Sequence, residues 1–193
     1  GFDLVVPNAG VAHPAPLAVS DAAKQEETIA VNLLGNMQVI QAALPAMLRK
    51  RKGDIIAVVS MGGIIALENY TAYSASKFGM RGFLWSLSGE LKGTGVNLSG
   101  MYCSAVDTPM LHEEARNPYG SPLNFMGKVS SPQEVVTRAL KAIEKPQLEI
   151  YLPYSDSWTA RILGFFPRLL MKLQPVFISS GEKGRKKYLQ KLM

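Results

Sequence analysis

The stretch Ile55-Ile56-Ala57-Val58-Val59-Ser60 carries the clearest structural signal in the chain. Its five apolar residues are uninterrupted and mostly β-branched, which is typical of a strand buried on both faces of a parallel sheet. Helical patterns lie on both sides of this run, at residues 33–50 and 71–92. Because parallel neighbours need a crossover connection, usually a helix, this arrangement predicts a fold of the α/β class.

The alternation of strands and helices extends along the chain. Short apolar runs predict three more strands, the first of them buried, and a capped run with proline in its first turn predicts another helix. The strands lie at residues 2–6, 96–101 and 148–152, and the helix runs from Ser131 to about Pro146. We therefore expect a Rossmann-like, doubly wound parallel sheet with helices on both faces.

Proline and glycine mark the places where these patterns should break. Pro45 is expected to interrupt the helix at 33–50, and Gly53 to lie just past its end. Residues 102–128 contain three prolines and are expected to be irregular. Three further residues are expected to prevent a long helix near the C-terminus: Gly164, Pro167 and Pro175.

Composition and charge divide the chain in two. Its 193 residues are 47% hydrophobic, which is enough for one well-buried domain, and the single cysteine, Cys103, excludes an internal disulfide. Residues 1–157 hold 13 basic and 14 acidic side chains, whereas 158–193 hold eight basic and one acidic. The nearly neutral body argues against nucleic acid as a partner. We expect a catalytic body at 1–157 and a basic amphipathic tail at 158–193.

Tyr73 and Lys77 are four residues apart in a predicted helix, so their side chains share one face. An ammonium close to a phenol favours the phenolate, and we expect the pKa of Tyr73 to fall toward neutral pH. Such a tyrosine can exchange a proton with an alcohol or a ketone. Alternatively, Tyr73 packs on a core and Lys77 is solvated, and other residues must decide between the two interpretations.

Three polar positions lie where predicted strands end. Ser60 ends the buried strand and precedes Tyr73 by 13 residues, Asn8 follows the strand at 2–6, and a further loop follows the strand at 96–101. Ligands of open parallel sheets bind beyond the carboxyl ends of the strands. Ser60 therefore lies at the edge where a ligand is expected.

These residues together resemble the classical short-chain dehydrogenase/reductase family. The order and spacing of five motifs agree with that family, and the resemblance covers roughly residues 1–152. The motifs are Asn8-Ala9-Gly10, Asn32 in Val31-Asn32-Leu33-Leu34-Gly35, Ser60, Tyr73-x-x-x-Lys77 and Val106-Asp107-Thr108-Pro109.

The resemblance implies hydride transfer between NAD or NADP and an alcohol or ketone. It makes Tyr73 the general acid or base, Lys77 the residue that lowers the Tyr73 pKa and binds the nicotinamide ribose, and Ser60 a donor to the substrate oxygen. Asn32, in a locally opened helix, would hold a water that connects Lys77 to solvent. Cofactor contacts are implied for Asn8, Ala9, Gly10, Tyr73, Lys77, Val106 and Thr108. A turn, a helix break and a helix cap are the purely structural alternatives for Ser60, Asn32 and Thr108.

The chain departs from the family pattern in two places. No Gly-rich phosphate loop follows the first strand, and the glycines 89, 93 and 95 close a helix instead of opening one. We therefore expect the first βαβαβ part of the fold, with that loop, to lie upstream of Gly1. The second departure is Cys103-Ser104, where the family usually has Pro-Gly, beside the nicotinamide. His13 and His112 lack partners at metal-ligand spacing and are expected in surface loops, without a metal.

The hydrophobic tail and the Met- and Pro-rich stretch 101–128 suggest an apolar substrate such as a lipid ketone, sterol or retinoid. The basic tail can lie on an anionic membrane surface, or cover the substrate pocket or another subunit. No uncharged apolar run of 18 residues indicates a membrane span. We expect a cytoplasmic protein, with or without peripheral membrane association. A homodimer or homotetramer through the helices at 33–50 and 71–92 is implied by the family.

Two alternatives to an oxidoreductase remain at this point. The chain is either a truncated, non-catalytic product that keeps the site residues without binding a cofactor, or a membrane-surface or interaction module that acts through residues 158–193.

Overall fold

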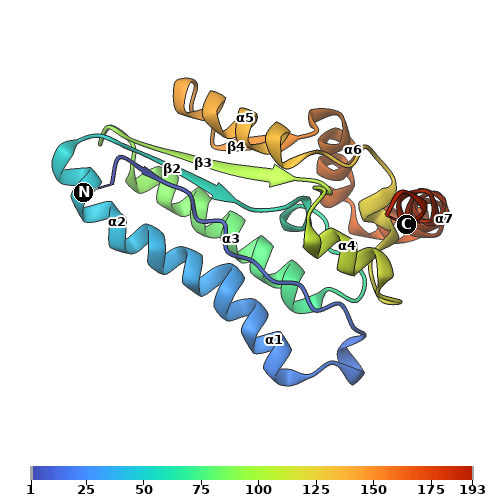
Figure 1. Ribbon diagram of the computed structural model, residues 1–193. Coiled ribbons are helices and arrows are strands. Elements are labelled where there is room, and N and C mark those ends of the chain that lie inside the picture. The colour runs from blue at the N-terminus through green and yellow to red at the C-terminus, as the bar shows by residue number, and fades with distance from the viewer. Residues whose placement is uncertain (1, 193) are drawn as a thin grey trace.

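A computed structural model describes residues 2–192, except for the side chain of Asp156. Four strands form one parallel sheet in the order β1-β2-β3-β4 (Figure 1). The strands are β1 (Leu4–Val5), β2 (Gly53–Val58), β3 (Val96–Cys103) and β4 (Glu149–Leu152). The parallel α/β fold predicted from the sequence is confirmed.

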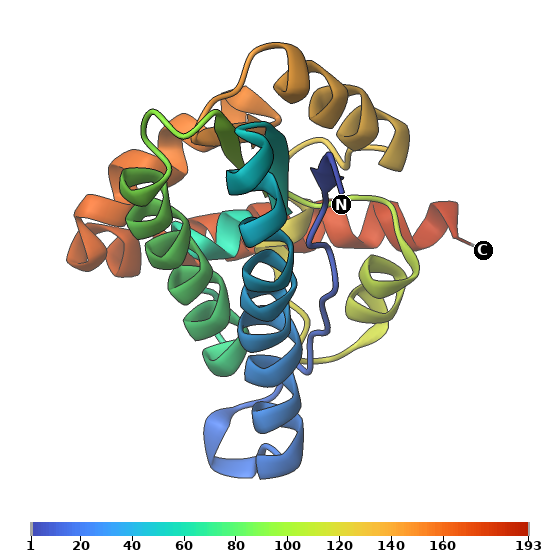
Figure 2. The same ribbon diagram turned by 90° about the vertical axis from the view of Figure 1, so that its left-hand side faces the viewer.

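Seven α-helices and four short helical segments connect and cover these strands within the described residues. The α-helices are α1 (Ala22–Ile29), α2 (Asn36–Lys50), α3 (Thr71–Glu90), α4 (Pro109–Arg116), α5 (Pro132–Glu144), α6 (Tyr154–Phe165) and α7 (Pro167–Lys191). The short segments are the 3-10 turns η1 (Leu17–Val19), η3 (Met61–Gly63) and η4 (Pro122–Phe125), and the π-helix η2 (Ala30–Gly35). Figure 2 shows α1, η2 and α2 as one continuous helical column.

The residues of β2 alternate between two hydrophobic cores. Ile55 and Ala57 pack with side chains of α2 and α3, such as Met47 and Leu84, whereas Ile56 faces the opposite side and packs with Ala142 of α5. Successive side chains of a strand point to opposite faces, so a strand covered on both sides needs an apolar residue at every position. Figure 1 shows α2 and α3 on one side of the sheet and α5 on the other.

The first strand is shorter and less buried than predicted. Only Leu4–Val5 form β1, and Phe2, Leu4 and Val6 are 70%, 42% and 45% exposed. Within the described sheet β1 pairs with β2 alone, which leaves its other edge uncovered and explains this exposure. An apolar run by itself does not distinguish an edge strand from a central one.

The end of α2 also differs from the prediction. Pro45 lies inside α2 without interrupting it, at an exposed position, and Gly53 begins β2. Arg51 instead takes the left-handed conformation that ends the helix, with φ 52°. A Cβ on Gly53 would lie 2.6 Å from Cγ of Met47, so this position needs glycine for close packing against α2.

Helices replace the irregular segments predicted in the second half of the chain. Residues 102–128 contain α4, which Thr108 caps and whose first turn holds Pro109. The expected break at Pro175 is wrong as well: α7 is 25 residues long and includes Pro175. Pro167 lies in its first turn, where the missing N–H costs nothing. The packing of α7 against η4 stabilises this helix beyond what its residues' helix propensity provides.

Within the described residues, Ala22–Lys50 is one helical stretch long and apolar enough to cross a membrane by length and composition. Core helices of soluble proteins pass the same test, so it is weak evidence for a span. One face of this stretch packs on the sheet through Ile40, Ala43 and Met47.

Candidate active site

Ser60 lies directly beyond β2, at the start of the turn η3. Its Oγ accepts a hydrogen bond from the backbone N–H of Gly62 at 3.0 Å. A Cβ on Gly62 would lie 3.1 Å from Cε1 of Tyr73 and 3.4 Å from Oγ of Ser60, so the two side chains are neighbours. A Cβ on Gly63 would lie 2.8 Å from the backbone oxygen of Lys77, so glycine lets this turn pack directly on α3. The close approach brings Ser60 to the face of α3 that carries Tyr73.

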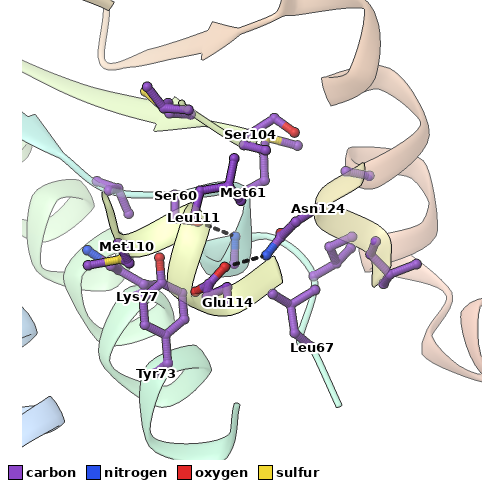
Figure 3. A pocket seen from close by; sticks show the side chains of 18 of the residues that line it. Ser60, Met61, Leu67, Tyr73, Lys77, Ser104, Met110, Leu111, Glu114 and Asn124 are labelled. Carbon is purple, nitrogen blue, oxygen red and sulfur yellow. Dashed lines mark hydrogen bonds between the residues drawn. The ribbon is translucent and has the colours of Figure 1, made fainter. Parts of the chain in front are cut away.

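Tyr73 and Lys77 lie one turn apart near the start of α3. The Nζ atom of Lys77 is 5.5 Å from the centroid of the Tyr73 ring, and Lys77 is only 5% exposed. Figure 3 shows Ser60, Tyr73 and Lys77 around one pocket. The structure therefore brings together the three residues that the sequence placed at a strand end and on one helix face.

The pKa values of this pair differ from the prediction. Burial is the largest cause of a rise in the pKa of Tyr73 to about 12; the Ser60 hydrogen bond opposes this rise, and the negative charge of Glu114 adds to it. Burial also lowers the pKa of Lys77 to about 8. The expected fall of the Tyr73 pKa is not found, because both groups lose hydration and the charged form of each is disfavoured.

Asn32 holds the segment that follows β1. Its side chain makes two hydrogen bonds with the backbone of Val11, accepting from the N–H at 2.8 Å and donating to the oxygen at 2.9 Å. Asn32 lies in the π-helix η2, which agrees with the expected locally opened helix. A Cβ on Gly10 would lie 3.5 Å from Oδ1 of Asn32 and 3.8 Å from Nζ of Lys77. Gly10 therefore lies close to both side chains, and the proton relay stays a prediction.

The Asn8-Ala9-Gly10 turn is held by a residue that the sequence reasoning missed. Asn36 donates to the backbone oxygen of Ala9 at 2.9 Å and to that of Asn32 at 3.1 Å. Asn8 and Gly10 line the pocket. A second asparagine one helical turn after Asn32 is the only sequence signal that pointed to Asn36.

Val106 and Thr108 approach the pocket from the loop between β3 and α4. Thr108 Oγ1 donates to the backbone oxygen of Val106 at 3.2 Å and accepts from the N–H of Leu111 at 3.4 Å. Thr108 is thus the cap of α4, as its structural alternative stated, and both residues also line the pocket. Cys103 and Ser104 line it as well.

The pocket is a cavity of about 750 Å³ with a mostly apolar lining. The body supplies one wall, and the tail helices α6 and α7 supply another. The apolar lining includes Ile65, Leu67, Met110, Leu111, Leu123, Met126, Val135, Ala160, Leu163, Leu170 and Phe177. Residues of the basic tail therefore help to enclose the cavity that Tyr73 faces.

Three polar residues of the cavity wall were missed from the sequence. Glu114 on α4 is 8% exposed and accepts a hydrogen bond from Nδ2 of Asn124 at 2.8 Å. Tyr70 lies near enough to lower the pKa of Glu114, and its ring meets that of Tyr73 edge-on, with centroids 5.8 Å apart. Burial raises the pKa of Glu114 to about 7. No motif spacing joins these residues, so only the folded chain reveals them.

Both histidines have acidic neighbours. Nε2 of His13 is 2.9 Å from a carboxylate oxygen of Glu27, and Nε2 of His112 is 2.8 Å from one of Asp107. In the part of the chain that the structure describes, no group of three His, Cys, Asp or Glu side chains is arranged to hold a metal ion.

Known proteins are similar to this chain in sequence. The family described as short chain dehydrogenase matches residues 1–118. The chain is 33% identical over 155 residues to estradiol 17-beta-dehydrogenase 11 of Macaca fascicularis, covering 79% of this chain and 49% of that protein. It is 32% identical over 142 residues to D-threitol dehydrogenase of Mycolicibacterium smegmatis, covering 72% and 55%.

The fold agrees with these matches. A solved structure of a short chain dehydrogenase/reductase family protein superposes with a TM-score of 0.67 at 20% identity, covering 77% of this chain and 64% of that one. The chain spans about half the length of the curated relatives that it matches. The match over more than half of the chain, together with the fold, shows that the chain belongs to the short-chain dehydrogenase family.

Proposed function

We propose that the protein transfers a hydride between NAD(H) or NADP(H) and an alcohol or ketone. The observation that carries this proposal is the convergence of Ser60, Tyr73 and Lys77 on one wall of the 750 Å³ cavity. Proton exchange with an alcohol needs an ionisable hydroxyl within reach of the substrate oxygen, and Tyr73 supplies one.

The residues of the cavity fit the nicotinamide half of such a cofactor. Lys77 is buried at the cavity, and among the described residues its ammonium has neither an ion pair nor a hydrogen bond. A buried ammonium needs acceptors, which a ribose supplies with its hydroxyl groups. We propose that Lys77 and Tyr73 hold the ribose, that Asn8, Ala9 and Gly10 form the adjacent wall, and that Val106 and Thr108 hold the carboxamide. The cofactor, when bound, supplies or accepts the hydride.

Each catalytic residue then has a distinct task. Tyr73 donates its proton to the ketone oxygen during reduction and takes it back from the alcohol during oxidation. Ser60, which lines the cavity together with Tyr73, donates to the same substrate oxygen and stabilises the charge that develops there. Lys77 favours the ionised form of Tyr73 once its own charge is stabilised by ligand acceptors. Asn32 takes part in proton exchange with solvent through a bound water.

The substrate that we propose is an apolar alcohol or ketone, of lipid, sterol or retinoid type. The predominantly apolar lining of the cavity supports this class.

Calorimetric titration of the native protein with NADH and with NADPH tests the function. We expect heat with at least one cofactor, followed by turnover of apolar alcohols in preference to polar ones. If neither cofactor gives heat, the rival function of a non-catalytic family member is favoured instead. A preference for polar alcohols would overturn the apolar substrate class alone.

We also propose that residues 158–193 form a tail that contacts an anionic membrane surface from the cytoplasmic side. The corner between α6 and α7 exposes Phe165 to 83%, Phe166 to 58% and Met171 to 70%, beside the exposed cations Arg168 and Lys172. Apolar side chains flanked by cations suit the boundary between anionic headgroups and acyl chains.

Replacing both Phe165 and Met171 with serine is expected to reduce vesicle binding about tenfold or more, because two large apolar side chains no longer enter the bilayer. Co-sedimentation with vesicles of phosphatidylcholine and phosphatidylserine measures it. Leu140→Ser, which removes a 57% exposed side chain from α5, is the matched control and should have no effect. Equal sedimentation of both variants and the wild type would exclude this surface.

A homodimer or homotetramer through α2 and α3 completes the proposal. Val39 on α2 and Phe78 and Trp85 on α3 are 49%, 44% and 50% exposed, and a second copy of the chain would cover them.

A further inference from the structure

Glu114 is a buried acid that the proposed reaction does not use. It lies in the wall of the cavity beside Leu111 and Met110, and Figure 3 shows it at the same pocket as Tyr73. None of the ion pairs within the described residues includes Glu114. Taking a carboxylate out of water without a cation costs free energy, so packing alone does not explain an acid at this position.

One neighbour orients the Glu114 carboxyl: Nδ2 of Asn124 donates to Oε2 at 2.8 Å. Tyr70 also lies near enough to lower the pKa of this carboxyl. The Tyr70 hydroxyl accepts from the N–H of Ser121 at 3.2 Å, so its own proton is free to be donated within the cavity. A carboxylate offers about four acceptor sites, and the Asn124 bond leaves sites for a further donor.

Glu114 also lies near the reacting end of the cavity. Tyr70, which lines the same cavity, contacts the Tyr73 ring edge-on, and the charge of Glu114 is one of the causes that raise the pKa of Tyr73. A substrate whose oxygen meets Tyr73 and Ser60 would therefore place neighbouring carbons beside Glu114.

We propose that Glu114 is a substrate-positioning residue that binds a second hydroxyl group, so that the protein selects apolar alcohols or ketones hydroxylated close to the reacting carbon. This inference rests on the proposed function. It adds a specific polar contact to a cavity whose lining is mostly apolar. A site built to hydrogen-bond a hydroxyl discriminates against analogues that lack it far more strongly than an apolar wall discriminates by size.

The probes are cyclohexanol and the three cyclohexanediols, with hydroxyls in 1,2, 1,3 and 1,4 positions. The first measurement is the rise in melting temperature that each compound causes in the native protein and in Glu114→Leu and Glu114→Gln variants. We expect at least one diol to stabilise the wild type more than it stabilises Glu114→Leu, while cyclohexanol affects both equally. The same ligand response in the wild type and Glu114→Leu for all three diols would overturn the proposal.

The second measurement is kcat/KM with the preferred cofactor. For the responding diol, Glu114→Leu should lose about 10- to 100-fold, the range expected for a hydrogen bond to a charged group, mainly through KM. For cyclohexanol the change should stay within about twofold. Glu114→Gln keeps an acceptor oxygen, so its kcat/KM for the diol should lie between those of the wild type and Glu114→Leu. If kcat/KM falls equally for the diol and for cyclohexanol, Glu114 only stabilises the position of α4, and the proposal fails.

Glu113→Gln is the matched control, because Glu113 is the exposed neighbour on α4 and should leave every value unchanged. The two proposals fail separately. If a diol stabilises the wild type but no turnover is found, the proposed oxidoreductase function is wrong and the hydroxyl site stands. If turnover is found and does not depend on Glu114, the hydroxyl site is wrong and the oxidoreductase function stands.

Discussion

Replacing Tyr73 with phenylalanine should lower kcat about 10²- to 10⁴-fold, the range that a positioned general acid contributes. The variant keeps the aromatic ring, with its edge-on contact to Tyr70, and loses the hydroxyl that Tyr73 brings to the cavity beside Ser60. Steady-state kinetics with the cofactor identified by calorimetry measures the loss. Affinity for the cofactor should change little by comparison.

Tyr119→Phe is the control for this prediction. Tyr119 is 42% exposed and lies outside the cavity lining, so deletion of its hydroxyl should leave kcat unchanged. If Tyr73→Phe kept more than about a tenth of the wild-type kcat, Tyr73 would not be the general acid, and the proposed mechanism would be wrong.

The second large effect is expected where α7 packs on η4. A Cβ on Gly184 would lie 1.9 Å from the backbone oxygen of Phe125, and one on Gly181 would lie 2.2 Å from that of Pro122. Backbone oxygens cannot rotate away, so Gly184→Ala forces α7 off η4. Overpacking of this kind costs about 1–3 kcal/mol or more of unfolding free energy. Because Leu170 and Phe177 of α7 line the cavity, the same change should weaken substrate binding.

Urea unfolding and limited trypsin digestion of α7 measure this effect. Gly89→Ala on α3 is the matched control, since no atom lies within 4 Å of its added Cβ and it has ordinary helical backbone. Helix propensity alone predicts that Gly89→Ala stabilises the protein by up to about 1 kcal/mol. The unfolding free energy should therefore fall in Gly184→Ala and rise in Gly89→Ala. A stabilised Gly184→Ala variant would contradict the docking of α7 on η4.

Side-chain periodicity explains why so much of the fold was predictable. The run at 55–59 needed burial on both faces, and the structure places it in the middle of the sheet, between β1 and β3. The spacing from Tyr73 to Lys77 put both on one helix face, and the end of β2 put Ser60 beside them. These relations depend on local geometry, which repeats every two residues in strands and every 3.6 in helices.

Other features depended on contacts between distant segments. Pro45 and Pro175 lie within helices that packing stabilises, although each proline removes a backbone hydrogen bond. Glu114, Tyr70 and Asn124 meet only after α4 and η4 fold over the cavity.

By itself, then, the sequence determined the α/β class, the family motifs and the placement of Tyr73 and Lys77 on one helix face, because these follow from short-range spacing. Only the tertiary structure decided the raised pKa of Tyr73, the buried acid at Glu114 and the docking of α7, because burial depends on which distant segments cover a group. The stretch at 55–60 illustrates both: its residues form the strand, but the position of Ser60 gains chemical meaning only when α3 packs against it.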